Sequence, residues 1–164
     1  MPIILPIEAK CNKTICYNLC VDHLTPSKRS WNMSRIKSKN TSPEVIFRKI
    51  LFSLGGRYRL NYSLPGKPDI VLPGRKIAVF INGCFWHQHK KCKRSSVPKS
   101  NRIYWIPKLE RDITRQTEVI KLLNKMNWKT ILIWECQVLQ FSKIKGIINS
   151  QILHDKQSEK TKNV

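Results

Sequence analysis

One short segment of the chain concentrates side chains that bind metal ions and transfer protons. Cys84, His89 and Cys92 have C-x4-H-x2-C spacing, and loops of this kind supply thiolate and imidazole ligands to tetrahedral zinc. Such a site needs a fourth ligand, and Cys136, at the end of a later apolar run, is the candidate. His87 lies in the same loop but outside this set, so it is free for chemistry. The spacing therefore predicts a zinc loop that borders a reactive site.

A second candidate for chemistry is Asp69, which follows Pro68 at the start of a predicted strand. Phosphodiester hydrolysis needs a hard cation that polarises the phosphate and generates hydroxide, and carboxylates hold such ions. The following strand is predicted to run antiparallel, so its last residues, and the loop with His87 that follows them, should lie beside Asp69. This placement favours a catalytic role. An aspartate after Gly-Lys-Pro is also a common turn residue, so the motif alone leaves both interpretations open.

The charge of the chain points to its partner. The 164 residues carry 31 Lys and Arg against 10 Asp and Glu, a formal net charge of +21. An excess of this size favours a phosphate backbone as partner, whereas a solvated basic surface or an anionic membrane is the alternative. No apolar run reaches the roughly 18 residues of a spanning helix, and no basic amphipathic helix is evident. We therefore expect a nucleic-acid partner and no membrane.

The cellular location follows from the start of the chain and from its cysteines. The apolar first seven residues contain two prolines and lack a basic stretch before them, which is atypical of a signal peptide. Several of the 6 cysteines fit a metal site rather than disulfides, which favours a reducing compartment. The predicted location is the cytoplasm, in association with the nucleoid.

The composition divides the chain into four parts. Residues 1–21 lack periodicity and are predicted to be a disordered extension, in which loose thiols are favoured over a second metal site at Cys11, Cys16 and Cys20. Residues 22–40 read as an arm that becomes ordered on nucleic acid, or as a plain flexible lead-in. Residues 41–154 form the folded domain, and 155–164 a polar tail. The arm's basic candidates for DNA binding are Arg35, Lys37 and Lys39.

Within the folded domain, apolar periodicity predicts helices around a mixed sheet. Ser42 suits a helix N-cap, Pro43 its first turn, and two glycines end that helix. Strands joined by a turn as short as Pro-Gly-Arg must be antiparallel. The fold class is α/β or α+β. The predicted elements are a helix over 42–54, strands over 69–72, 76–82 and 129–134, and helices over 107–126 and 143–154.

Four motifs, in order, resemble the very short patch repair (Vsr) DNA mismatch endonucleases. The motifs are Asn32–Ile36, Leu64–Asp69, Gly83–His87 and Ile133–Cys136, and the resemblance runs from residue 22 to 139. It implies a fold of the restriction-endonuclease type with a structural zinc loop. The implied reaction is a magnesium-dependent nick 5′ to the T of a T·G mismatch, the product of 5-methylcytosine deamination. The implied protein is a monomer on double-stranded DNA, with mismatch-repair proteins as candidate partners.

The resemblance also assigns roles in catalysis. It implies that Asp69 and the main-chain carbonyl of Ile81 bind magnesium, that His87 is the general base, and that Glu44 supports the water on the metal. Packing is the alternative for His87, and a charge at a helix N-terminus is the alternative for Glu44. The family's zinc ligands fall on Cys84, His89, Cys92 and Cys136, the set that the spacing also proposes.

Recognition of the mismatch is assigned to aromatic side chains. The resemblance implies that Phe85, Trp86 and Trp105 form a wedge inserted from the major groove, and that Met33 enters the minor groove. A wobble pair is held less tightly than a Watson–Crick pair, so unstacking at the mismatch costs less. The alternative for Phe85 and Trp86 is ordinary core packing.

Two features depart from the family pattern: the residue at position 82, and the two residues instead of one between His89 and Cys92. Asn82 stands where the best-known pattern has a histidine, and an amide forms hydrogen bonds but carries no proton at neutral pH. The mechanism then leans more heavily on His87. Two other functions remain as alternatives: a restriction-type endonuclease on unmismatched duplex, and a zinc-containing DNA-binding module without catalysis.

Overall fold

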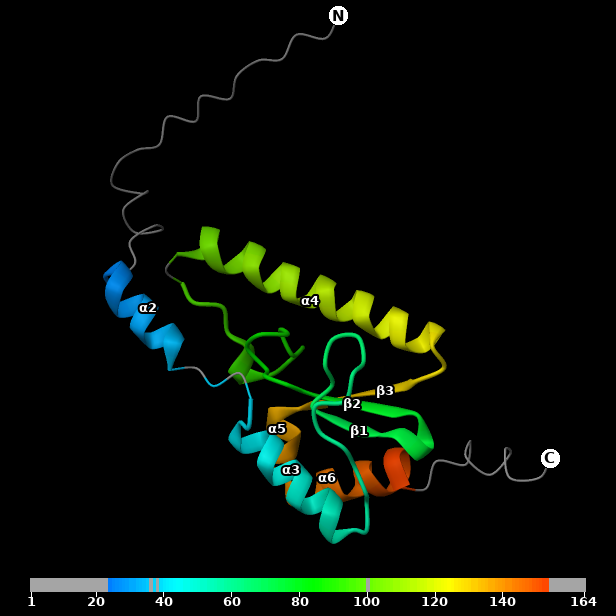
Figure 1. Cartoon of the computed structure of the whole chain (residues 1–164). Helices are drawn as coiled ribbons and strands as arrows, with labels where there is room; N and C mark the ends of the chain where they lie inside the picture. Colours follow the sequence, from blue (N-terminus) through cyan, green and yellow to red (C-terminus); the bar gives the residue numbers. More distant parts are fainter. Residues whose placement is uncertain (1–23, 36, 38, 100, 154–164) are drawn as a thin grey trace, which may run out of the picture.

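The computed structural model describes residues 24–153 except 36, 38 and 100 (Figure 1). The predicted extension over 1–21, with its cysteines, and the predicted tail over 155–164 lie outside the described residues. The division into extension, arm, domain and tail stays a prediction. No helix in the described part is long and apolar enough to cross a membrane.

A three-stranded mixed sheet lies at the centre of the domain. Its order is β1-β2-β3, with β1 at Ile70–Leu72, β2 at Ile77–Asn82 and β3 at Lys129–Trp134. The pair β1–β2 is antiparallel across the short η1 turn, Pro73–Arg75, whereas β2–β3 is parallel. A parallel pair needs a long crossover, and α4, Arg102–Lys125, lies within it. The predicted mixed sheet is confirmed.

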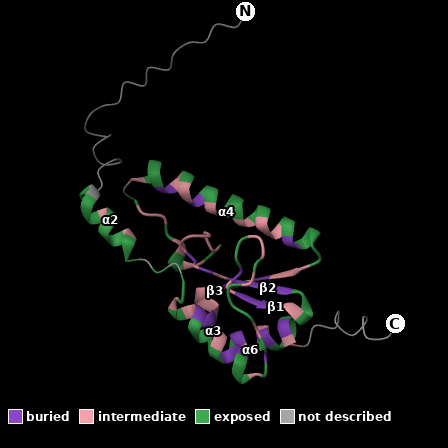
Figure 2. Cartoon of the chain, in the orientation of Figure 1, coloured by how far each residue is buried: buried purple, intermediate pink, exposed green. Residues whose placement is uncertain are grey.

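Helices cover both faces of this sheet (Figures 1 and 2). Odd-numbered residues of β2 pack with α3, α6 and η3, whereas Ala78 and Phe80 pack toward Leu123 of α4. Because side chains alternate along a strand, burial on both faces explains the continuous apolar run of β2. The remaining elements are α2 (Pro26–Ser34), α3 (Ser42–Ser53), η2 (Lys93–Ser95), α5 (Glu135–Val138), α6 (Phe141–Ile147) and η3 (Ile148–Leu153).

The helix boundaries differ from the predictions in three places. Helix α4 begins at Arg102, so Pro107 lies inside it instead of opening it. Proline is favoured in the first turn of a helix, whereas further along it removes one backbone hydrogen bond and its ring crowds the carbonyl of residue i−4. The predicted final helix over 143–154 is instead α6 followed by the π-type η3, and the short helix α5 precedes them. The arm, predicted without regular structure, contains α2, whose N-cap Thr25 accepts a hydrogen bond from the Lys28 N–H.

Candidate active site and metal centre

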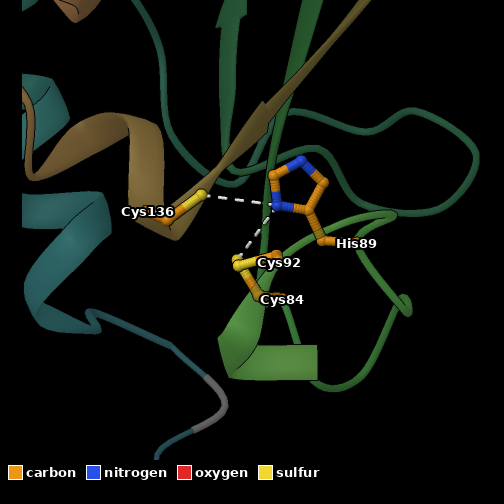
Figure 3. A group of neighbouring side chains, drawn as sticks. All are labelled: Cys84, His89, Cys92 and Cys136. Atoms are coloured by element: carbon orange, nitrogen blue, oxygen red, sulfur yellow. Dashed lines mark hydrogen bonds between the residues drawn. The ribbon is translucent and has the colours of Figure 1, made fainter. Parts of the chain in front are cut away.

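Three cysteines and a histidine meet where the loop after β2 approaches the end of β3 (Figure 3). The ligand atoms of Cys84, His89, Cys92 and Cys136 all lie within 4.8 Å of one another. His89 Nδ1 is 3.5 Å from the Cys84 sulfur and 3.4 Å from the Cys136 sulfur. Around a tetrahedral zinc ion, sulfur and nitrogen ligands are separated by about 3.6 Å. The cluster therefore could hold a metal ion, and its geometry suits zinc.

The surroundings of the cluster hold its ligands in place. The imidazole of His89 stacks on Trp134, the last residue of β3, with ring centroids 4.2 Å apart and an interplanar angle of 7°. Cys84 is fully buried, and this burial raises the pKa of its thiol to about 12. Since zinc binds the thiolate, metal binding at this cluster must release the Cys84 proton.

Asp69 lies just before β1, opposite the end of β2. The Ile81 N–H donates a hydrogen bond of 2.7 Å to Asp69 Oδ2. The pKa of Asp69 is raised to about 6, mainly by burial and also by the charge of Glu44, while the Ile81 N–H and the Arg48 guanidinium oppose the shift. Burial disfavours the charged form of a carboxylate, and a bound cation would stabilise that form. Asp69 therefore has the environment expected of a metal ligand.

The turn before Asp69 explains why the motif contains glycine. Gly66 has a φ of +72°, and a Cβ atom there would lie 2.4 Å from Val119 Cγ1 on α4. A larger residue would both strain the backbone and collide with the helix. Gly66 thus lets the Leu64–Asp69 segment pass closely under α4.

Glu44 is buried in the first turn of α3, with 8 % of its surface exposed. Its carboxylate accepts hydrogen bonds from the Asn40 N–H at 2.9 Å and the Thr41 hydroxyl at 2.7 Å, and pairs with Arg48 at 3.4 Å. These contacts match the alternative in which Glu44 stabilises a helix N-terminus. Its charge also raises the pKa of Asp69, so it faces the same site.

His87 is half-buried in the loop after β2. Within the described part of the chain, its Nδ1 atom is buried and has no hydrogen-bond partner. Burial lowers the pKa of His87 and Arg115 adds to this, while the carboxylate of Asp112 opposes it. The imidazole is therefore neutral at pH 7 and able to accept a proton, as a general base requires.

These predicted catalytic residues border a single cleft of about 630 Å³. Glu44 reaches it from α3, Asp69 from the turn before β1, and Ile81 and His87 from β2 and the following loop. Several other polar and charged residues line the same cleft and were not predicted from the sequence. They are Lys67, Asp112, Arg115, Gln116 and Glu135. Of these, Asp112 and Arg115 form an ion pair of 3.0 Å on α4, an i, i+3 spacing that the sequence does display.

The predicted wedge residues contact one another beside this cleft. Phe85 meets Trp86 edge to face at 5.0 Å and Trp105 at 5.4 Å between ring centroids. Trp86 lines the cleft, whereas Trp105 is only 5 % exposed and lies under the Arg29 guanidinium at 5.7 Å. In this structure of the protein alone, Trp105 packs rather than projects. Its role as a wedge stays a prediction.

The arm residues differ in where they lie. Lys37 borders the cleft, and Lys39 is exposed outside it. Arg35 lies over the ring of Trp31 at 4.1 Å, and Met33 is partly buried. Of the predicted DNA-binding residues in the arm, only Lys37 thus borders the candidate catalytic site.

The fold and the cleft together define the class of protein. A mixed sheet between helices, with a carboxylate beside an antiparallel hairpin and a nearby Cys/His cluster, is restriction-endonuclease-like. The family model described as DNA mismatch endonuclease Vsr matches residues 21–94.

Individual relatives of known name are similar to this chain over a larger share of its length. The type II nicking enzyme V.NmeAIP of Neisseria meningitidis is 48 % identical over 122 residues, covering 71 % of this chain and 84 % of the relative. V.XorIIP of Xanthomonas oryzae, also a type II nicking enzyme, is 41 % identical, with 71 % and 86 % covered. The DNA mismatch endonuclease Vsr of Escherichia coli is 33 % identical, with 66 % and 69 % covered. The chain belongs to the Vsr family of DNA mismatch endonucleases, which confirms the predicted family and enzyme class.

Proposed function

We propose that this chain nicks one strand of double-stranded DNA on the 5′ side of the T in a T·G mismatch. The observation that carries the proposal is the convergence of Glu44, Asp69, Ile81 and His87 on one cleft of a Vsr-family chain. The net charge of +21 fits a phosphate backbone as substrate. By this proposal the chain acts on chromosomal DNA in the cytoplasm.

Magnesium is the proposed catalytic ion, held by Asp69 and the main-chain carbonyl of Ile81. When bound, it would supply charge to polarise the scissile phosphate and to make water more acidic. The residues fit such an ion because the Asp69 carboxylate lines the cleft, and its burial there raises its pKa and so disfavours its negative charge in the absence of a cation. The Ile81 N–H keeps Asp69 Oδ2 in a fixed position.

The other cleft residues complete the proposed chemistry. His87, neutral at pH 7, accepts a proton from the attacking water. The Glu44 carboxylate adds negative charge that favours a cation beside Asp69. Lys37 and Arg115 lie at the cleft as partners for phosphate oxygens of the bound strand.

Zinc is the proposed structural ion at Cys84, His89, Cys92 and Cys136. It would join the loop after β2 to the end of β3, and so set the position of His87. The same loop carries Phe85 and Trp86, which we propose to insert at the mismatch, with Met33 of the arm on the minor-groove side.

The experiment is a nicking assay with magnesium on end-labelled duplexes that differ only in one base pair. The set contains a T·G mismatch, an A·C mismatch and a fully paired duplex. The proposal expects a single cut 5′ to the mismatched T that disappears when a chelator removes magnesium. Equal cutting of the paired duplex would instead support a restriction-type enzyme. Binding without any cut would support a non-catalytic module.

A further inference from the structure

A pair of side-chain amides joins β2 to α4 in the wall of the cleft. Asn82 Nδ2 donates a 2.9 Å hydrogen bond to Gln116 Oε1, and Gln116 Nε2 donates one of 2.8 Å to Asn82 Oδ1. Asn82 is 2 % exposed, and Gln116 is half-buried. The two reciprocal bonds therefore hold the plane of the Asn82 amide and couple it to Gln116, so that Asn82 cannot exchange its oxygen and nitrogen unless Gln116 turns with it.

The pair lies next to the groups proposed to do the chemistry. Asn82 ends β2 directly after Ile81, whose N–H holds Asp69, and both amides line the cleft with Asp69 and His87. An amide nitrogen has two N–H groups, and the pair uses one of them at each residue. The second N–H is a neutral donor that a phosphate oxygen accepts, and its charge does not change with pH.

We propose that Gln116 is a positioning residue for strand cleavage. It holds Asn82 so that the free N–H of the Asn82 amide donates to a phosphate oxygen of the strand that is cut. Without Gln116, these two hydrogen bonds no longer hold the plane of the Asn82 amide, so the side chain can turn about its last torsion and move its free N–H away from the phosphate. This inference rests on the proposed nicking function.

A double-mutant cycle tests whether Gln116 acts through Asn82. The variants are Gln116→Ala, Asn82→Ala and the two combined, measured by single-turnover nicking of the T·G duplex and by duplex affinity. We expect Gln116→Ala to lower the maximal rate by about 10-fold to 100-fold and the affinity by less than about 3-fold. In the Asn82→Ala background, the same change should cost less than about 2-fold. Independent effects that multiply would overturn the proposal.

Two further variants guard against a merely structural effect. Asn124→Ala alters an exposed amide on the same helix, outside the cleft, and should leave the nicking rate unchanged. Gln116→Met keeps a side chain of similar length without adding charge, and it forms neither hydrogen bond with Asn82. If Gln116→Ala fails to fold, a loss of rate in Gln116→Met at wild-type melting temperature supports the proposal. An unchanged rate in that variant contradicts it.

A spectroscopic measurement separates this inference from the proposed function. The Asn82 and Gln116 amide protons are followed by NMR while a T·G duplex is added without magnesium, so no cutting is needed. The inference expects a shift of the Asn82 side-chain signals in the wild type, and its loss in Gln116→Ala. Failure of the wild type to nick any duplex would contradict the proposed function. An unshifted Asn82 signal in a bound complex would sink the role of Gln116.

Discussion

The Cys/His cluster and the carboxylate cleft are neighbours, but they are built in different ways. Three of the four cluster ligands come from one loop, Cys84–Cys92, and Cys136 follows the adjacent parallel strand. The cleft instead draws on α3, the turn before β1, the end of β2 and the middle of α4. The cluster is thus a local assembly that shapes one loop, whereas the cleft exists only when the whole domain has folded.

This difference suggests a division of labour. In the cluster, a metal ion would satisfy every ligand and leave no position for a substrate, as structural zinc sites do. In the cleft, Asp69 keeps a raised pKa and His87 keeps a buried nitrogen without a partner among the described residues. Perturbed and unsatisfied groups are typical of sites that act on a ligand. Changes at the cluster should therefore affect stability first, and changes at the cleft should affect nicking first.

Removal of a cluster ligand should have the largest effect on the stability of the fold. Cys136→Ser weakens zinc binding, because Cys84, His89 and Cys92 lose the ligand that follows β3. We expect a fall in melting temperature of at least about 10 °C, or ~3 kcal/mol, together with loss of bound zinc. Calorimetry and zinc analysis on the same samples check this result. Full stability with no zinc bound would refute a structural role for the cluster.

In the cleft, His87→Ala should reduce nicking without unfolding the domain. General base catalysis is worth about 100-fold to 10,000-fold, so single-turnover rates should fall within that range while duplex affinity stays near that of wild type. Lys90→Ala, an exposed change in the same loop, is the matched control. A rate loss of less than about 3-fold would show that His87 only packs.

The pH dependence of the cleft follows from Asp69. Because the pKa of Asp69 is about 6 in the folded chain against an ordinary value of 3.8, the folded chain holds this proton more tightly than the unfolded chain does. Without magnesium, this residue therefore makes the fold less stable as the pH rises from about 4 to about 6, by on the order of 1–3 kcal/mol.

Comparing the wild type with Asp69→Asn isolates this contribution. The variant lacks the titration, so its free energy of unfolding relative to wild type should rise over the same pH interval. Urea unfolding in a chelator at several pH values measures the difference. At subsaturating magnesium, wild-type nicking should fall about tenfold per pH unit below 6, since protonated Asp69 does not hold the cation. A difference in stability that is constant with pH would mean that Asp69 is not perturbed.

The smallest effect is expected at the edge of the cleft. Lys37→Ala removes one exposed charge, so duplex affinity should fall a few-fold and the slope of log affinity against log salt should decrease by about 1. Lys143→Ala, an exposed change on α6 outside the cleft, should change neither quantity. Equal effects of the two substitutions would mean that binding depends on net charge rather than on position.

The sequence predicts the two regions unequally, for physical reasons. The cluster could be predicted because metal ligands in one loop must have short, regular spacing. The position of Asp69 beside the end of β2 could be predicted because Asp69 lies at the start of a hairpin. The contact of Gln116 with Asn82 could not be predicted, because it depends on which face of α4 lies against β2. The same uncertainty applies to Ile113 of α4 and to its C-cap Met126: apolar periodicity alone places them in the core, but both are exposed.

Local rules also failed where tertiary contacts decide the structure. The sequence predicts that this helix begins at Pro107, but α4 extends back to Arg102 and brings Trp105 against Phe85. Packing of Trp105 in this aromatic group offsets the hydrogen bond that Pro107 cannot make.

The most direct test of the whole account is single-turnover nicking of the T·G duplex by Asp69→Asn, with binding and melting measured on the same preparation. The account predicts a loss of at least about 1,000-fold in rate, unchanged zinc content, duplex binding close to wild type, and a melting temperature at or above that of wild type. Nicking at a rate near that of wild type would contradict the assignment of the cleft as the catalytic site.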